Sequence, residues 1–308
     1  MPAFFCHIGF NNWMLQLFGQ SDNPGIMLFF AIPDDFAHTL FTLFTNNPDF
    51  LPQISLFPGL KNCKALYENH FLMKNFNPDR IRVVGFDADD TLWVNEPYYR
   101  ETEEKFCGLM KQFGGPDEIQ RLLFEVEMNN MELYGYGTKA FMLSLIETAV
   151  KVSDGKVCVT DIQRIIDMGK EQIAMKNALL PNVRDVLEAL SGHYRLIVAT
   201  KGDLLDQERK LKNSGIAGYF HHIEIMTDKT EDHYRNLLNH LDIPAEEFLM
   251  VGNSLKSDVL PVICLGGHAI HVPFHVTWKH ELLQDHELSG YHYYSVKTIK
   301  DLMPLLGL

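Results

Sequence analysis

The chain has 308 residues, of which 46% are hydrophobic and 22% are charged, a composition typical of a globular protein with a sizeable core. Its 40 acidic and 27 basic residues give a formal charge of −13, which disfavours nucleic acid or an anionic membrane surface as the main partner. The five cysteines form no C-x-x-C pair, and their odd number is typical of unpaired thiols in a reducing compartment. We therefore expect a cytoplasmic protein.

The first 72 residues differ in composition from the rest of the chain. They hold 12 of the 21 phenylalanines but only seven charged residues, and no lysine or arginine precedes Lys61. They lack the positive segment of a signal peptide and an apolar run long enough to span a membrane. No repeat or helical period there is long enough to define an element. We therefore expect either an extension of uncertain order or a leader upstream of a true start at Met73.

From residue 80 onwards, apolar β-branched segments alternate with segments of helical period. The run IRVVGF (81–86) predicts a buried strand. From 97 to about 180 the apolar spacing is helical, apart from a possible short strand at KVCV (156–159). Further strands are predicted at YRLIVAT, HHIEIM, FLMVG and AIHV (194–200, 221–226, 248–252 and 269–272). Further helices are predicted at about 183–191, 204–214, 233–241 and 296–306.

Strands that alternate with helices along a chain favour a parallel sheet covered by helices on both faces. We therefore predict an α/β fold with a doubly wound, Rossmann-like parallel sheet. Residues 80–95 and 181–308 are expected to form this core. Residues 96–180 are expected to form a helical domain inserted after the first strand.

Polar side chains follow the predicted strands at their carboxyl ends, where ligands gather in such sheets. The sequence DADDT places Asp87, Asp89 and Asp90 directly after the first strand, where their charges repel one another unless a cation lies between them. We expect Asp90 to be structural, because its two neighbours already supply the chemistry. The later strands are followed by Thr200 and Lys201, by Lys229, and by Asn253 and Asp258.

These residue types suit a metal ion and a phosphate group. Carboxylate and amide oxygens that converge on one point are ligands for a hard cation such as Mg²⁺. A hydroxyl, an ammonium and backbone amides beside them suit phosphate oxygens. The predicted metal ligands are Asp87, Asp89, Asn253 and Asp258. The predicted phosphate-binding residues are Thr200, Lys201 and Lys229.

At these residues the chain resembles the haloacid dehalogenase superfamily of phosphatases and phosphotransferases. DADDTL (87–92) matches the family's D-x-D-x-T-L/V motif, Thr200 and Lys229 match its second and third motifs, and GNSLKSD (252–258) matches its fourth. The resemblance covers about residues 80–308 and is strongest to capped phosphatases, such as phosphoglycolate phosphatases and 5′-nucleotidases. It implies that the helical insertion is a cap over the active site.

The resemblance implies a covalent mechanism, with a small phosphorylated metabolite as substrate and Mg²⁺ as cofactor. Asp87 would attack phosphorus and form an aspartyl-phosphate, and Asp89 would protonate the leaving oxygen and then activate water. Dehalogenases of the family lack the second carboxylate, so Asp89 favours a phosphatase. Most members have aspartate where this chain has Asn253, and its neutral amide is expected to weaken metal binding.

The substrate and the type of phosphoryl transfer stay open. A phosphotransferase or mutase of the same superfamily, and a weakly active protein that binds a phosphorylated ligand, are the alternatives to a phosphatase. In NNMELYGYGTKAF (129–141), glycines interrupt a helical block, and Tyr134, Tyr136 and Lys139 are candidates for substrate contacts. A kink between two helices with packing tyrosines explains the same pattern equally well.

Overall fold

The computed structural model of the protein describes residues 6–10, 13–17, 76–284, 287–288, 291 and 293–308. The chain divides into two compact units, residues 1–70 and 71–308. In the first unit, β1 (Cys6–Phe10) and β2 (Trp13–Leu17) form an antiparallel pair. The sequence patterns predicted no element there. The rest of the predicted extension up to residue 72 lies outside the described residues.

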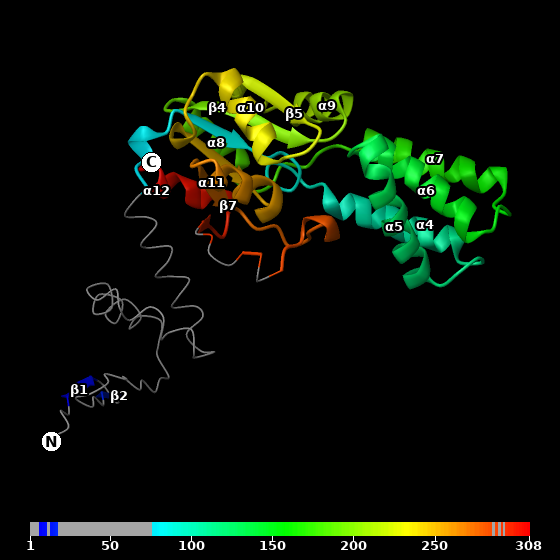
Figure 1. Ribbon diagram of the computed structural model, residues 1–308, viewed down its shortest axis with the longest axis horizontal. Helices are drawn as coiled ribbons and strands as arrows, with labels where there is room; N and C mark the ends of the chain where they lie inside the picture. The colour runs from blue at the N-terminus through cyan, green and yellow to red at the C-terminus, as the bar shows by residue number, and fades with distance from the viewer. Residues whose placement is uncertain (1–5, 11–12, 18–75, 285–286, 289–290, 292) are drawn as a thin grey trace. The chain divides into compact units, whose positions relative to one another are not determined.

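The second unit is built around a six-stranded sheet in which every strand pair is parallel (Figure 1). The strand order is β5-β4-β3-β6-β7-β8, so β3 lies between β4 and β6. The strands are β3 (Val83–Phe86), β4 (Arg195–Lys201), β5 (His222–Met226), β6 (Phe248–Gly252), β7 (His268–His271) and β8 (Tyr294–Ser295). The predicted parallel α/β fold is confirmed, and of the six strands of this sheet only the two-residue β8 was not predicted.

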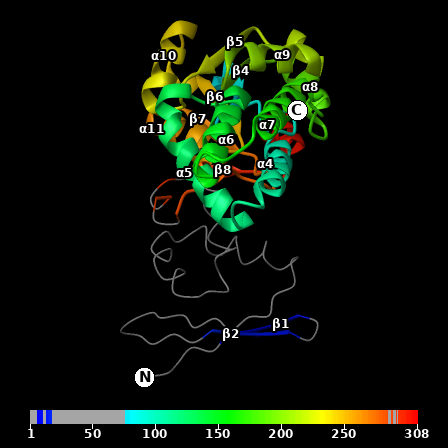
Figure 2. The ribbon, with the colours of Figure 1, turned by 90° about the vertical axis from the view of Figure 1, so that its right-hand side faces the viewer.

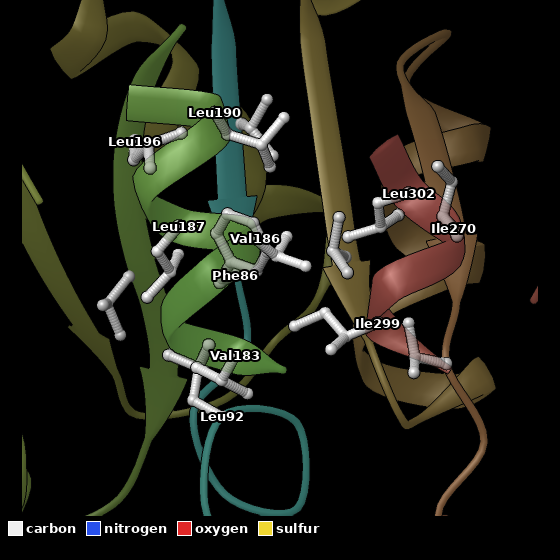
Figure 3. Packing of buried hydrophobic residues seen from close by; sticks show 14 of the residues in the cluster. Phe86, Leu92, Val183, Val186, Leu187, Leu190, Leu196, Ile270, Ile299 and Leu302 are labelled. Atoms are coloured by element: carbon white, nitrogen blue, oxygen red, sulfur yellow. The ribbon is translucent and has the colours of Figure 1, made fainter. Parts of the chain in front are cut away.

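Helices cover both faces of this sheet. On one face, Val186 of α8 and Leu302 of α12 join the apolar cluster that contains Phe86 of β3 (Figure 3). On the other, Leu237 of α10 and Val262 of α11 join a second apolar cluster. These helices are α8 (Val183–Ser191), α9 (Leu204–Ser214), α10 (Glu231–Leu241), α11 (Leu260–Cys264) and α12 (Leu302–Leu305).

Short turns complete the core. The helix predicted over 296–306 is shorter than expected. A capping box between Thr298 and Asp301 starts a 3₁₀ turn at Ile299, this turn continues into α12 at Leu302, and the chain turns at Gly307 with a positive φ. The 3₁₀ turns are η4 (Pro78–Arg80), η5 (Ala217–Tyr219), η6 (Ala245–Glu247), η8 (Lys279–Glu281) and η9 (Ile299–Asp301). A π-helical turn, η7 (Leu255–Val259), follows β6.

Four helices lie between β3 and α8, and we call them the helical insert. They form a group apart from the sheet in Figure 1, and Figure 2 shows them in front of the strands. Phe106, Leu123, Leu145 and Ile165 belong to their own apolar core. The helices are α4 (Glu96–Met110), α5 (Pro116–Tyr134), α6 (Thr138–Val152) and α7 (Val159–Ala174).

The possible strand at 156–159 was wrong. Residues 156–158 are irregular, and Val159 already begins α7. Cys158 is extended because it takes the N-cap position of that helix, where non-helical backbone is usual. Among the described residues, no helix combines the length and apolar character that crossing a membrane requires.

Two neighbouring chain segments connect the insert to the core. The backbone N–H of Val94 donates to the Ala178 carbonyl at 3.0 Å, and that of Leu180 donates to the Leu92 carbonyl at 2.9 Å. The outgoing and returning chains are therefore paired directly beside the carboxyl end of β3, which is where the polar residues of the first predicted motif lie.

Candidate active site

The carboxyl edge of the sheet and the helical insert line one cavity of about 200 Å³. In parallel sheets this edge is the usual place for a ligand, because successive loops leave the strands on the same side. The strand-end residues that line the cavity are Asp87, Asp89, Thr200, Lys201, Lys229, Asn253 and Asp258. All the residues predicted for catalysis, phosphate binding and metal binding are thus brought together.

Asp87 lies at the centre of the buried part of the site. Its backbone N–H donates to the Val251 carbonyl at 2.8 Å, which continues the pairing of β3 with β6. Its Oδ1 accepts a hydrogen bond from Lys229 Nζ at 2.6 Å, and its Oδ2 accepts one from the Thr91 hydroxyl at 3.0 Å. Burial raises the pKa of Asp87 to about 7, although the nearby Lys229 ammonium opposes the shift.

Lys229 joins two buried carboxylates. Its Nζ donates to Asp87 Oδ1 and to Asp258 Oδ1, each at 2.6 Å, and its side chain is 2% exposed. Burial alone lowers the pKa of Lys229, but the charges of Asp258 and Asp87 raise it well above its usual value. The ammonium is therefore held charged beside the nucleophile candidate, as contact with a phosphate group requires.

The oxygen atoms around Asp87 fit a hard divalent cation. The Thr91 hydroxyl lies 3.0 Å from Asp87 Oδ2 and 3.3 Å from Asn253 Oδ1, so the carboxylate and the amide oxygen approach the same point. Asp258 approaches from η7 because Gly252 has no Cβ, and a Cβ there would overlap the Asp258 carboxylate. Two carboxylates against one ammonium leave a net negative charge, which favours a further cation.

The side chain of Asp89 is held by three donors. Trp93 Nε1 lies 2.6 Å from its Oδ1, and Gln207 Nε2 lies 2.8 Å from its Oδ2. Lys210 Nζ lies 2.9 Å from Oδ1 and 3.1 Å from Oδ2. Every one of these contacts is donated to Asp89, so both of its carboxylate oxygens act as hydrogen-bond acceptors and the side chain is fixed in the cavity.

The neighbouring Asp90 has a structural position. It adopts a positive φ of 63°, and its carboxylate accepts hydrogen bonds from the backbone N–H groups of Asn95 and Glu96 at the start of α4. Thr200 is buried at the end of β4, and its hydroxyl donates to the Lys201 carbonyl at 3.2 Å.

Lys201 is engaged by other residues of the core and the insert. Its Nζ donates to Glu281 at 2.6 Å and to the Ser257 hydroxyl at 2.9 Å, and it lies 4.3 Å from the centre of the Tyr136 ring. Although burial alone raises the pKa of Glu281, Lys201 lowers it to about 2. The Lys201 ammonium, which the sequence predicts to bind phosphate, is therefore paired with Glu281 in this structure.

The three candidates in the insert have different positions. Tyr136 lines the cavity, and its hydroxyl donates to Asp228 at 3.3 Å. Lys139 does not line the cavity but forms an ion pair with Asp203 at 2.9 Å. Tyr134 is 47% exposed and is absent from the cavity wall.

Several cavity residues had no signal in the predicted motifs. Gln207 and Lys210 lie three positions apart on α9, so they share the helix face that reaches Asp89. Trp278 and Glu281 come from the loop after β7 and line the same cavity. Both lie seven or more positions beyond the end of β7 at His271, so the strand-end rule that located the other residues did not reach them.

Comparisons with known proteins now place the chain in a family. The model of the haloacid dehalogenase-like hydrolases matches residues 81–266. A haloacid dehalogenase-like family hydrolase from Xanthomonas campestris is 34% identical, covering 74% of this chain and 93% of its own, with a TM-score of 0.66. The protein belongs to the haloacid dehalogenase-like hydrolase family, and the predicted resemblance is confirmed.

More distant structures share the fold. The putative hydrolase YfnB from Bacillus subtilis, solved with bound magnesium, is 15% identical over 74% of this chain and 100% of its own, with a TM-score of 0.51. L-2-haloacid dehalogenase from Xanthobacter autotrophicus is 15% identical over 74% and 98% of the two chains, with a TM-score of 0.54. The fold thus hosts different chemistries, and the reaction must be argued from the site. A comparison with curated proteins gives no match.

Proposed function

We propose that the protein is a Mg²⁺-dependent phosphatase that hydrolyses a small phosphorylated metabolite through an aspartyl-phosphate on Asp87. The observation that carries this proposal is the pair of carboxylates, Asp87 and Asp89, which line one cavity from positions two apart in the sequence. Displacement of a halide needs a nucleophile but no proton donor. Displacement of an alkoxide also needs an acid, and Asp89 supplies that group.

The residues of the chain account for both steps. Asp87 attacks phosphorus, and the bond to the leaving oxygen breaks as that oxygen takes a proton from Asp89. In the second step, water transfers a proton to Asp89 and attacks the same phosphorus, which releases phosphate and restores Asp87. Lys229 and Thr200 contact the non-bridging oxygens, where the charge of the transition state is spread.

Asp87, Asn253, Asp258 and the carbonyl of Asp89 are the groups that would hold Mg²⁺. The bound ion supplies positive charge that offsets the repulsion between the carboxylates and the phosphoryl dianion. Asn253 contributes an uncharged amide, so the site is expected to need more Mg²⁺ than a site with a third carboxylate.

The helical insert is proposed to act as a cap that closes the cavity over the substrate. Tyr136 and Lys139 contact Asp228 and Asp203 of the core, so the insert is tied to the loops that carry the phosphate-binding residues. Phe124 and Tyr136 present aromatic rings to the cavity. Aromatic rings suit the apolar face of a sugar or a base, and closure would hold the substrate in position against Asp87.

The test is a panel of phosphorylated metabolites and 2-haloacids, assayed for phosphate and halide release with Mg²⁺ and with excess chelator. We expect Mg²⁺-dependent phosphate release from a subset of the phosphate esters and no halide release. Halide release would replace the proposal with a dehalogenase. Movement of labelled phosphate between positions of one sugar would indicate a mutase, and tight binding without turnover would indicate a phospho-ligand sensor.

A further inference from the structure

A cluster of three metal-ligating side chains lies outside the active site. His222 and Glu224 are two positions apart on β5, so their side chains share one face of the strand. His240 lies in the last turn of α10. His222 Nε2 is 2.8 Å and His240 Nδ1 is 3.9 Å from the same carboxylate oxygen, Glu224 Oε2. One ligand atom from each residue falls within 4.8 Å of the other two.

This cluster is separate from the phosphatase site. None of its three residues lines the cavity. β5 is at the edge of the sheet and begins at His222, whereas Lys229 follows the opposite, carboxyl end of the same strand. The side chains of His222 and Glu224 are each 30% exposed and that of His240 is 67% exposed, so an ion can reach them from solvent.

We propose that His222, Glu224 and His240 bind a divalent transition-metal ion, with Zn²⁺ as the best match. Two imidazoles and one carboxylate form a common zinc ligand set, with bonds of about 2.0–2.2 Å. Tetrahedral bonds of that length place ligand atoms about 3.3–3.6 Å apart. The observed separations of 2.8 Å and 3.9 Å lie on either side of this value, so small side-chain rotations complete the site.

The ligand chemistry separates this ion from the one proposed for the active site. Imidazole nitrogens suit Zn²⁺ and related ions, whereas Mg²⁺ takes oxygen ligands. Zn²⁺ bound here would join the end of α10 to the edge strand β5. The unfolded chain does not hold the three ligands together, so binding stabilises the folded state.

The experiment measures Zn²⁺ binding by calorimetry to the full chain in excess Mg²⁺, which occupies the oxygen-rich site. Wild type is compared with His240→Ala and Glu224→Gln, and with the matched control His221→Ala, which removes an exposed neighbouring imidazole outside the cluster. Loss of one of three ligands is expected to weaken Zn²⁺ binding about tenfold or more, while the control keeps it. Zn²⁺ binding at other sites in the chain is common to all variants, so it cancels when their binding is compared with that of wild type.

Thermal unfolding provides the second readout. Zn²⁺ is expected to raise the melting temperature of wild type and His221→Ala, and to leave that of His240→Ala unchanged. His240 is largely exposed, so its substitution is expected to preserve the melting temperature measured without metal. Equal Zn²⁺ affinity and stoichiometry in wild type, His240→Ala and Glu224→Gln would overturn the proposal. An equal loss of Zn²⁺ affinity in the His221→Ala control would also overturn it, because Zn²⁺ binding would then not depend specifically on the three residues of the cluster.

Discussion

Lys210 on α9 links Asp89 to the start of the helical insert. Its Nζ lies 2.9 Å from Asp89 Oδ1 and also 2.9 Å from Asn95 Oδ1, the residue that immediately precedes α4. Burial alone lowers the pKa of Lys210, but the Asp89 carboxylate raises it above its usual value. One charged side chain therefore positions the proposed acid–base residue and contacts the connection to the insert.

Lys210→Met is expected to lower kcat by about 10- to 100-fold, a part of the effect of losing a general acid–base group. The reason is that Asp89 keeps its contacts with Trp93 and Gln207 but loses both hydrogen bonds from the ammonium. Lys212→Met is the matched control, because Lys212 is exposed on the same helix. Steady-state kinetics measure kcat in both variants. Unchanged kcat in Lys210→Met would show that Asp89 does not need to be positioned by Lys210.

Asn253→Asp is expected to lower the Mg²⁺ concentration that gives half-maximal rate. The substitution adds a negative charge beside Asp87, where the Thr91 hydroxyl already joins the two side chains, and charge increases affinity for a hard cation. Turnover at saturating Mg²⁺ is expected to stay level or fall, because the added charge repels the phosphate. Asp258→Asn is the opposing control and should raise the required concentration. If Asn253→Asp leaves that concentration unchanged, Asn253 is not a ligand.

Residues 73–308 are expected to fold and to keep turnover without the preceding segment. The basis is the change in composition near residue 72 and the compact unit formed by residues 71–308. Cooperative thermal unfolding and kcat/KM of the shortened chain provide the measurement, with the full chain as the reference. An insoluble or inactive product would show that the first 72 residues belong to the catalytic unit.

Glu127→Gln is expected to stabilise the fold at pH 8.5 and to have little effect at pH 4.5. Burial within the insert, aided by the charges of Glu103 and Glu96, raises the pKa of Glu127 to about 8 from an ordinary value of 4.5. The unfolded chain therefore ionises first, and folding becomes costly as pH rises from 4.5 towards 8. At high pH, Glu127→Gln is therefore expected to increase the free energy of unfolding by about 1–3 kcal/mol.

Thermal unfolding at the two pH values measures this difference. Glu125→Gln, which changes an exposed residue of the same helix, is the matched control and should shift neither midpoint. An equal gain from Glu127→Gln at both pH values would mean that the stabilisation does not come from ionisation of the carboxyl group.

Much of the core was predictable because a parallel sheet repeats one rule. Each buried strand has an apolar run, and the residue after it reaches the same edge, so Asp87, Thr200 and Asn253 could be assigned to one site without knowledge of the strand order. Lys210 and Glu281 were not predictable in this way. Each reaches the site with a long side chain, from a helix or a loop whose orientation depends on packing rather than on local pattern.

The insert shows a second limit of sequence patterns. Tyr134 ends α5 and Tyr136 stands between two glycines with positive φ, 67° at Gly135 and 107° at Gly137. These conformations break the helical phase, so two tyrosines that are two positions apart have different surroundings. Tyr136 lines the cavity while Tyr134 is exposed, and no periodicity could have separated them.

The most direct test of the account is the rate of phosphate release by Asp87→Asn on the best substrate of the panel, with saturating Mg²⁺. An amide at this position cannot form the aspartyl-phosphate, so turnover is expected to fall to the background level. Unchanged melting temperature in the variant would show that the fold is retained. Phosphate release by Asp87→Asn at the wild-type rate would contradict the account, because another group would then be the nucleophile.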